Sequence, residues 1–468
     1  MLVAVTLLLG RLTNVAADFH HFGANASKWW DDSIHLPPVI YTGDPLFLTP
    51  LIQRGMLRHA KDRARVYPNW LDVPSYAGYF TVNEPTGSNM FFWFFPNQKL
   101  PSAPVVLWLE GGPGFTSLHG AFLENGPYMI SGDGELALRN ISWTKKFHML
   151  YIDNPVGTGY SFTTHEKGFA TDEDTVGRDL FDALQQFFTL FGEYSDNELY
   201  MAGSSYAGKF IPAAARVIHE YGNEAKMKLT GMIFGNSPCD PVTMLNYADF
   251  MLQIGVVSQR QADEVRSLAE QARESILLED YRAALEYRFD ILEKYMHFSG
   301  SKYVFNYLRN KEPPGMSRYY AFMQASETRK AIHVGNMPFH PTNRTVYRRL
   351  TNDRMQSIKP WIAQLMEHYR ILIYMGQLDV MVAAPLTAAF IDSIEWSGAD
   401  SLARAPRIIW RDAKTGDPVG YVRQAKKFTE VMVRGAGHRV GFEKPEVAFD
   451  MVVRFISGRG FGEPSNNS

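Results

Sequence analysis

Six short apolar runs, each closed by a glycine or proline turn, constrain the fold of this chain more than any other feature. Runs of three to six residues suit strands and are too short for helices. Such runs, without polar alternation, are typical of strands at the centre of a parallel sheet. The six runs are Val105–Leu109, Phe147–Ile152, Leu199–Ala202, Met232–Phe234, Ile371–Tyr374 and Val431–Val433.

Helical patterns alternate with these runs. Apolar residues recur at helical spacing between Val176 and Phe188, and a last helix is expected from Pro445 to just before Gly458. Two further strands are expected between Tyr76 and Phe95, where a Pro-Thr-Gly turn indicates a hairpin. Alternation of this kind predicts an α/β fold with a mostly parallel central sheet and helices on both faces.

One segment interrupts the alternation. Residues 241–335 are charged and rich in helix-forming residues, which predicts an inserted helical cap that shapes a substrate pocket. A solvated helical excursion without contact to substrate is the alternative. The predicted organisation is a signal peptide at 1–17, a core at 18–240, the cap at 241–335, a second core part at 336–460 and a tail at 461–468.

Ser205 lies in the most informative turn, directly after the run that ends at Ala202 and before a helical pattern. A nucleophile elbow is a crowded strand–turn–helix, and it needs small residues beside the serine. Gly203 and Ala207 supply them. Ser204 is the competing nucleophile, but the spacing from Gly203 favours Ser205.

A serine nucleophile also needs a base and a carboxylate that orients the base. In α/β-hydrolases these residues follow the serine as an acid and then a histidine, each after a strand. Asp379 follows the run that ends at Tyr374, and His438 follows the run that ends at Val433. The order predicts an α/β-hydrolase with Ser205, Asp379 and His438 as its catalytic triad.

A glycine-rich turn at 111–114 follows the first strand of the predicted core. Glycines let the backbone approach a substrate, so the amides of Gly112 and Tyr206 are the expected donors to an oxyanion. A phosphate cradle is the rival, but neither G-x-x-x-x-G-K-[ST] nor G-x-G-x-x-G occurs. The sequence also lacks H-E-x-x-H and paired cysteines, so no metal or other cofactor is expected.

Composition narrows the class of protein further. The net charge is −2 and no long Lys or Arg run occurs, which argues against a nucleic-acid partner. The single cysteine, Cys239, excludes an intrachain disulfide and is expected to be a buried small apolar residue.

An export signal is predicted at the start of the chain. Leu2–Leu9 is apolar and Val15–Ala17 offers a cleavage site, although Arg11 follows the apolar run instead of preceding it. The run is too short to span a membrane; a frayed apolar terminus is the alternative. Sequons for glycosylation, which fit export, occur at Asn25, Asn140, Asn343 and Asn466.

Five ordered blocks of sequence resemble the serine carboxypeptidases, with a likeness to the vitellogenic-like members. The blocks are Trp108–Gly114, Asp153–Phe162, the Ser205 elbow, Gly376–Asp379 and Gly437–His438. The resemblance implies a secreted or lysosomal exopeptidase that removes single C-terminal residues from peptides or proteins at acidic pH.

The same resemblance assigns recognition of the substrate's terminal carboxylate to positions 110, 111, 124 and 204. Gly111 and Glu124 match the family, but Glu110 stands where Asn or Gln is usual, and Ser204 where Glu is usual. Nearby, Arg439 replaces a usual Met and Gly441 a usual Pro.

A carboxylate at position 110 repels a substrate carboxylate unless it is protonated or a cation intervenes. We hypothesise that Glu110 and Glu124 share a proton, that Ser204 donates a hydrogen bond, and that binding requires acid. Capture of the carboxylate by Arg439, or loss of exopeptidase activity, are the alternatives.

Two other functions compete with the peptidase. The first is an esterase or acyltransferase on the same fold, because acyl-enzyme chemistry serves water or an alcohol alike. The second is a catalytically weak binding or storage protein. Residue specificity and oligomeric state do not follow from the sequence.

Overall fold

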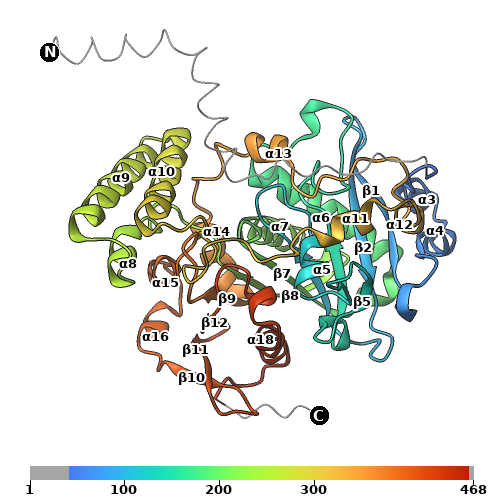
Figure 1. The fold of residues 1–468 in the computed structure, drawn as a ribbon. Helices are drawn as coiled ribbons and strands as arrows, with labels where there is room; N and C mark the ends of the chain where they lie inside the picture. Colours follow the sequence, from blue (N-terminus) through green and yellow to red (C-terminus); the bar gives the residue numbers. More distant parts are fainter. Residues whose placement is uncertain (1–41, 463–468) are drawn as a thin grey trace, which may run out of the picture. The chain divides into compact units, whose positions relative to one another are not determined.

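Ten strands of residues 42–462, the part of the chain that this computed structural model describes, form one sheet (Figure 1). All these residues belong to one unit, Val39–Ser468. In spatial order the strands are β1 (Tyr76–Asn83), β2 (Ser88–Phe95), β6 (His148–Ile152), β3 (Val105–Leu109), β7 (Glu198–Ser204), β8 (Lys228–Gly235), β9 (Arg370–Gly376), β12 (Phe428–Val433), β11 (Pro418–Ala425) and β10 (Ile408–Arg411).

The six central strands, from β6 to β12 in this order, are parallel to one another. They contain the six apolar runs except for Phe147, which directly precedes β6, so the predicted parallel core is confirmed. The predicted hairpin is the antiparallel pair β1 and β2. At the other edge, β10 and β11 are antiparallel strands that the sequence did not reveal. Three of their side chains, Ile409, Arg411 and Gln424, are exposed, and polar residues interrupt both strands, so they lack the continuous apolar pattern.

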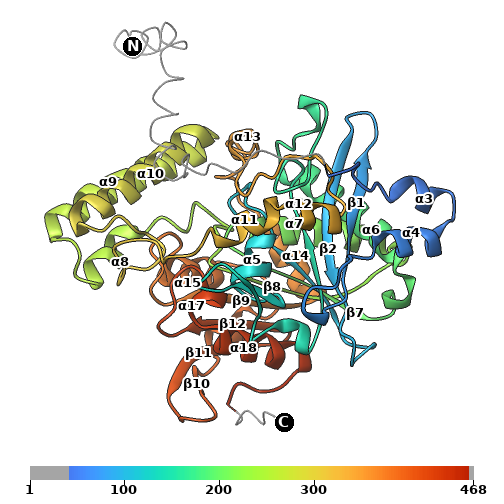
Figure 2. The same ribbon diagram turned by 45° about the vertical axis from the view of Figure 1, so that its right-hand side comes forward.

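Helices cover both faces of the sheet, as predicted (Figures 1 and 2). One group consists of α6 (Glu173–Leu190), α7 (Ala207–Tyr221) and α14 (Lys359–His368), and the other of α5 (Leu118–Leu123), α17 (Val440–Glu443) and α18 (Pro445–Ser457). The Asp172 side chain caps α6 by accepting a hydrogen bond from the Thr175 amide at 2.7 Å. Gly458, in the left-handed conformation, ends α18 at the expected place.

The predicted cap segment is mostly helical. A pair of long helices, α9 (Gln259–Leu277) and α10 (Tyr281–Ser299), projects from the sheet in both ribbon views (Figures 1 and 2). Three shorter helices, α8 (Tyr247–Gln253), α11 (Arg318–Gln324) and α12 (Ser326–Ala331), complete the segment. The cap's boundaries and its role at the substrate pocket stay predictions.

The cap is anchored beside the predicted catalytic acid. Tyr247 and Arg288 both donate hydrogen bonds to the Met381 carbonyl oxygen, at 2.8 Å and 3.0 Å. The Val380 and Met381 amides donate to the Val304 carbonyl oxygen. Since Met381 lies two residues after Asp379, the cap fixes the loop that carries this acid.

Smaller elements complete the fold. The helices are α3 (Thr49–Gln53), α4 (Leu57–Ala64), α13 (Arg344–Arg349), α15 (Ala384–Asp392) and α16 (Ala399–Ala403), and β4 (Tyr128–Ile130) pairs with β5 (Leu136–Leu138).

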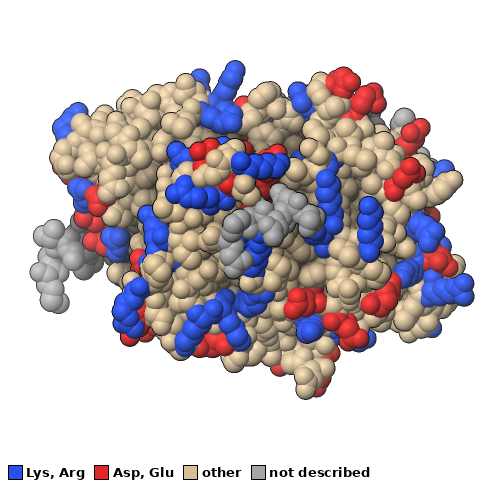
Figure 3. Space-filling model, turned by 90° about the horizontal axis from the view of Figure 1, so that it is seen from below, with Lys and Arg blue, Asp and Glu red and all other residues tan. Residues whose placement is uncertain are grey.

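Cys239 is buried, as expected, and burial raises the pKa of its thiol. On the face shown in Figure 3, Lys and Arg are interspersed with Asp and Glu.

Candidate active site

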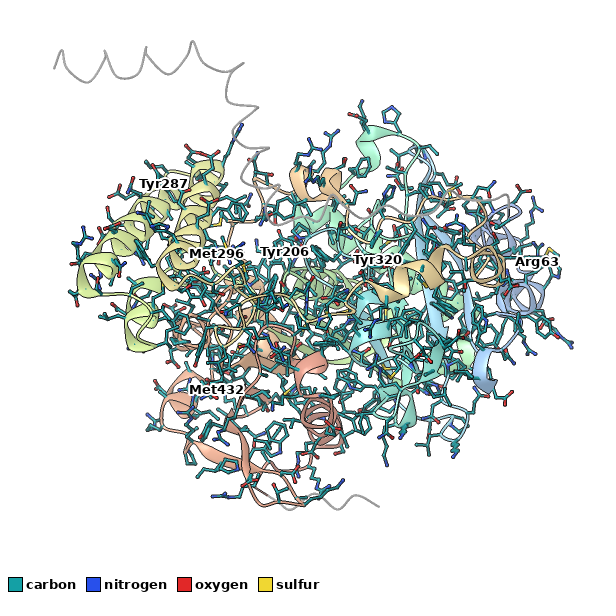
Figure 4. The ribbon with its side chains drawn as sticks, viewed as in Figure 1. Arg63, Tyr206, Tyr287, Met296, Tyr320 and Met432 are labelled. Carbon is teal, nitrogen blue, oxygen red and sulfur yellow. The ribbon has the colours of Figure 1, made fainter. Side chains whose placement is uncertain are left out.

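The loops that carry the predicted site residues meet at one edge of the sheet. Parallel strands share the edge at which their carboxyl ends lie, and open α/β sheets bind ligands there. Glu110 follows β3, Ser205 follows β7, Asp379 follows β9 and His438 follows β12. In Figure 4, Tyr206 lies between Met296 of α10 and Tyr320 of α11 in this view. The predicted site therefore lies at the edge where a ligand is expected.

Ser205 occupies a strained turn between β7 and α7. Its φ of 58° lies in the left-handed region, which is rare for a residue with a side chain. The Ser205 amide donates to the Gly235 carbonyl oxygen at 2.9 Å. A Cβ on Gly203 would lie 2.6 Å from both the Leu109 carbonyl oxygen and the Ala207 Cβ. This crowding is the reason that a nucleophile elbow needs small neighbours.

Asp379 and His438 are brought together and buried. The Nδ1 of His438 lies 2.7 Å from Oδ2 of Asp379. The His438 amide donates to the Phe305 carbonyl oxygen at 2.7 Å, and the ring centroids of the two residues are 5.0 Å apart. An acid so placed fixes the tautomer and orientation of the imidazole, which the role of a general base requires.

Asn236, which the sequence reasoning missed, ties the loops of the predicted triad together. Its Nδ2 donates to the His438 carbonyl oxygen at 2.5 Å, and its Oδ1 accepts from the Gly376 amide at 2.8 Å. The carbonyl oxygen of the preceding residue, Gly235, accepts a hydrogen bond from the Ser205 amide. The only signal in the sequence was a Gly-Asn pair at the end of a strand, which is also a common turn.

Within residues 42–462, Ser205 and His438 form no direct hydrogen bond. Catalytic hydrogen bonds are often long before substrate binds, so the missing bond does not rule out a triad. The hydrogen bonds of Asn236, which hold the loops of Asp379 and His438, are better evidence for how the three residues are arranged. The three residues come from different loops that are joined through Gly235 and Asn236. Their catalytic roles stay a prediction.

The predicted oxyanion donors lie free beside the elbow. In the described part of the chain, the amides of Gly112 and Tyr206 donate no hydrogen bond. A Cβ on Gly111 would collide with the Tyr206 amide and lie 2.7 Å from Ser205 Cβ, so the glycine loop packs directly on the elbow. The two N–H groups are therefore placed to serve one reacting oxygen.

A buried carboxylate holds the glycine-rich loop in place. Asp153 accepts hydrogen bonds from the Thr116 hydroxyl at 2.5 Å, the Ser117 amide at 3.0 Å and the Tyr160 amide at 2.8 Å. The Ser117 hydroxyl in turn lies 3.2 Å from the Glu110 amide, which donates to it. These bonds fix the path of the loop between β3 and α5.

Glu110 and Glu124 lie buried beside the elbow and act on each other. Burial and the Glu124 carboxylate raise the pKa of Glu110 to about 8, against the opposing charge of Arg439. Burial raises the pKa of Glu124 to about 7. One carboxyl oxygen of each has no hydrogen-bond partner among the described residues. Both groups therefore favour the protonated state, as a pair of facing carboxyls does.

The expected hydrogen bond from Ser204 to the two glutamates is not formed, and its side chain interacts with a tyrosine instead. The buried Ser204 side chain interacts with the hydroxyl of Tyr374, which itself donates to the Gly203 carbonyl oxygen at 3.0 Å. Among residues 42–462, Ser204 forms no hydrogen bond with Glu110 or Glu124. Burial raises the pKa of the Tyr374 hydroxyl, and the charges of Glu124 and Glu110 raise it further, so Tyr374 lies within electrostatic reach of both acids.

Two departures from the family pattern lie against Glu124. The Gly441 amide interacts with this carboxylate and lowers its pKa, against the effect of burial, and a Cβ on Gly441 would lie 3.0 Å from Glu124 Cβ. The positive charge of Arg439 acts on both glutamates. A proline at 441 would have no N–H to donate. The substitutions at 110, 439 and 441 therefore form one connected cluster.

Below the elbow lies a second buried group that sequence reasoning missed. Lys209 donates to the Asp353 carbonyl oxygen at 2.7 Å, and Tyr206 donates to Asp353 Oδ2 at 3.2 Å. This network holds Tyr206, whose amide is the second predicted oxyanion donor. No three His, Cys, Asp or Glu side chains of the described residues gather as metal ligands do.

Of the predicted sequons, Asn25 and Asn466 lie outside the described residues. Asn140 is exposed. Asn343 is partly buried and caps α13, accepting from the Thr345 amide at 2.8 Å and donating to the Gly157 carbonyl oxygen at 2.7 Å. A glycan on Asn343 would be attached to Nδ2, the same atom that donates to Gly157. Glycosylation at each position stays a prediction.

Comparison with known proteins agrees with this geometry. A model of the serine carboxypeptidase family matches residues 67–458. The venom serine carboxypeptidase of Apis mellifera is 43% identical over 90% of this chain and 92% of its own length. The probable serine carboxypeptidase CPVL of Homo sapiens is 41% identical over 92% of this chain and 93% of its own.

A solved structure shows the same fold. The prohormone-processing carboxypeptidase Kex1(delta)p of Saccharomyces cerevisiae superimposes with a TM-score of 0.74 and 21% identity, covering 86% of this chain and 98% of its own. The predicted α/β-hydrolase fold is therefore confirmed, as is the resemblance noted from the sequence blocks. By the extent of the matched residues and the identity to these relatives, the chain belongs to the serine carboxypeptidase family.

Proposed function

We propose that this protein is a serine carboxypeptidase that removes C-terminal residues from peptides through an acyl-enzyme on Ser205. The observation that carries the proposal is the buried contact of 2.7 Å between His438 Nδ1 and Asp379 Oδ2, at the sheet edge where Ser205 forms a strained elbow. Family membership supports peptide bonds as the substrate class.

In the first half of the reaction, His438 takes the proton of Ser205 as the hydroxyl oxygen attacks the scissile carbonyl carbon. Asp379 stabilises the imidazolium that forms. The Gly112 and Tyr206 amides donate to the developing oxyanion. When the tetrahedral intermediate collapses, His438 gives its proton to the leaving amine, and the C-terminal amino acid departs.

In the second half, a water molecule occupies the position of the departed amino acid. His438 takes a proton from this water while the water oxygen attacks the acyl carbon. Collapse of the second intermediate returns the proton to Ser205 and releases the shortened peptide with a new carboxylate. The buried Asp379 keeps the imidazole oriented through both halves.

The same site supports activity at acidic pH. Below about pH 7, Glu110 and Glu124 are protonated because burial raises the pKa of Glu110 to about 8 and that of Glu124 to about 7. A neutral acid pair accepts the terminal carboxylate of a substrate without repulsion. As pH rises through these values, both groups ionise and affinity for a free carboxylate falls.

The proposed location is the secretory pathway, either secreted or lysosomal. The predicted signal at 1–17 supports it but lies outside the described residues. A relative named as a venom protein also supports export. Over residues 42–462, no helix combines the length and apolar character that crossing a bilayer takes.

The test combines active-site labelling with peptide digestion. A fluorophosphonate probe should label the wild-type protein and the Ser204→Ala variant but not Ser205→Ala. Mass spectrometry of peptides incubated between pH 4 and 7 should show stepwise loss of C-terminal residues. Labelling with turnover of simple esters alone would favour the esterase or acyltransferase, and no labelling of Ser205 would favour a binding or storage protein.

A further inference from the structure

Arg439 is a largely buried cation next to the predicted catalytic base. It follows His438 directly, and 14% of its side chain is exposed. Its guanidinium carbon lies 5.1 Å from the centre of the Phe305 ring, which also packs on His438. A buried guanidinium is costly unless anions or hydrogen-bond acceptors surround it, so its partners indicate its role.

The direct partner of Arg439 is an exposed glutamate. Nη1 of Arg439 donates to Oε1 of Glu312 at 2.9 Å, and 54% of the Glu312 side chain is exposed. Glu312 lies in the irregular segment between α10 and α11. The other N–H groups of Arg439 donate no hydrogen bond within residues 42–462. Because exposed ion pairs are weak, another carboxylate can replace Glu312.

The other acids near Arg439 do not neutralise it. Glu110 is 9% exposed and Glu124 is 2% exposed, and each has one carboxyl oxygen without a hydrogen-bond partner among the described residues. Neither forms an ion pair with Arg439. When both acids are protonated, the cluster is a cation beside two groups that can each donate a hydrogen bond. This is the chemistry that binds a carboxylate.

The segments that carry the cluster adjoin the elbow and the predicted catalytic base. Glu110 precedes Gly111, whose added Cβ would lie 2.7 Å from Ser205 Cβ. Glu124 packs on Gly441, two residues after Arg439. The terminal carboxylate of a substrate lies one residue beyond the scissile bond, or roughly 3.5 Å along the chain. A group that binds this carboxylate must therefore lie next to the elbow, as Glu110 before Gly111 and Arg439 after His438 do.

We infer that Arg439 is the cation that binds the terminal carboxylate of the substrate, and that Glu312 occupies its guanidinium until the substrate displaces it. The inference rests on the proposed carboxypeptidase function. It makes Arg439 a determinant of specificity for peptides with a free C-terminus, and Glu312 an internal competitor for the same site.

Kinetics with paired substrates test the inference. N-acetyl-Phe-Leu carries a free carboxylate, whereas N-acetyl-Phe-Leu-amide does not. In Arg439→Met, KM for the free acid should rise about tenfold or more, since a charged hydrogen bond is lost, while kcat and KM for the amide stay near wild type. Arg439→Lys should recover part of the affinity. Glu312→Gln should lower KM for the free acid by about two- to fivefold.

Binding to the Ser205→Ala protein separates this inference from the proposed function. Calorimetric titration of both compounds into Ser205→Ala, with and without Arg439→Met, needs no turnover. Preferential loss of free-acid binding supports the inference, even if the wild-type protein hydrolyses neither compound. Equal weakening of acid and amide, or no change in either, overturns it, because a merely structural role for Arg439 does not distinguish the two compounds.

Discussion

At the scale of single residues, the site depends on which buried groups are paired and which favour the neutral, protonated state. Asp379 and His438 satisfy each other at 2.7 Å. Among the described residues Glu110 and Glu124 form no ion pair, and burial favours the protonated state of both. Asp379 is paired with an imidazole, whereas each glutamate keeps one carboxyl oxygen without a hydrogen-bond partner among the described residues, and these different surroundings give the groups different tasks.

The Asp379→Asn variant tests the orienting role of the acid. The amide preserves the size of the side chain but stabilises the wrong imidazole tautomer and cannot stabilise the imidazolium. We expect kcat to fall by about 10³- to 10⁴-fold with little change in KM. Peptide hydrolysis followed by mass spectrometry measures this loss. Asp400→Asn, on exposed α16, should leave kcat unchanged, and a similarly active Asp379→Asn would remove Asp379 from the triad.

The Glu110→Gln variant tests the repulsion argument. In the wild type, KM for a free-acid substrate should rise as pH increases through about 8, where Glu110 ionises beside Glu124, Arg439 and Tyr319. Glutamine keeps a neutral polar side chain at every pH. We expect the ratio of KM at pH 8.5 to KM at pH 5.5 to fall by about tenfold in the variant. An unchanged ratio would show that the charge at 110 does not govern affinity.

At the scale of elements, the elbow depends on close packing between β3, β7 and α7. Gly203 has room for no side chain, because a Cβ would lie 2.6 Å from a carbonyl oxygen of β3 and from Ala207. The cap acts at the same scale: its Val304 and Phe305 carbonyl oxygens hold the loops of Asp379 and His438. Neighbouring elements thus set the positions of all three predicted triad residues.

The Gly203→Val variant tests this packing. The added side chain must push β3 or α7 away from the elbow, so we expect a loss of about 1–3 kcal/mol in the free energy of unfolding. Labelling of Ser205 by a fluorophosphonate should slow strongly. Urea unfolding and labelling rates measure the two effects. Gly192→Ala is the matched control, because a Cβ there meets nothing within 4 Å; normal labelling of Gly203→Val would contradict the crowded-elbow account.

At the scale of the whole molecule, buried acids couple stability to pH. Burial, with help from Asp182 and Asp172, raises the pKa of Asp179 on α6 to about 7. Glu110 and Glu124 are raised in the same direction. The folded state then binds protons that the unfolded state has already released at neutral pH. The contribution of these groups to the free energy of unfolding is therefore fully present in acid, and it is lost as pH rises through their pKa values in the folded state.

The free energy of unfolding should consequently fall between pH 5 and pH 8. In Asp179→Asn the fall should be smaller, because one of the titrating groups is gone. Urea unfolding at pH 5, 7 and 8.5 measures both slopes. Glu446→Gln, on an exposed part of α18, should reproduce the wild-type slope. A steady rise in stability up to pH 8 would contradict protonation of these acids in the folded protein.

The sequence by itself determined the core of the fold and the order of the candidate triad. Six apolar runs predicted six parallel strands because strands buried on both faces need apolar side chains throughout. Ser205, Asp379 and His438 could be named because each follows such a run. Local patterns of this kind are visible in the chain without knowledge of its tertiary contacts.

Only the tertiary structure decided how distant residues act on one another. Asn236 binds the loop of His438, and Glu312 pairs with Arg439, across long separations in the sequence. The strands β10 and β11 were also hidden, since they form by pairing with each other and, for β11, with β12, and not from an apolar pattern. Hydrogen bonds and burial depend on which segments meet, and the periodicity of a single segment does not contain that information.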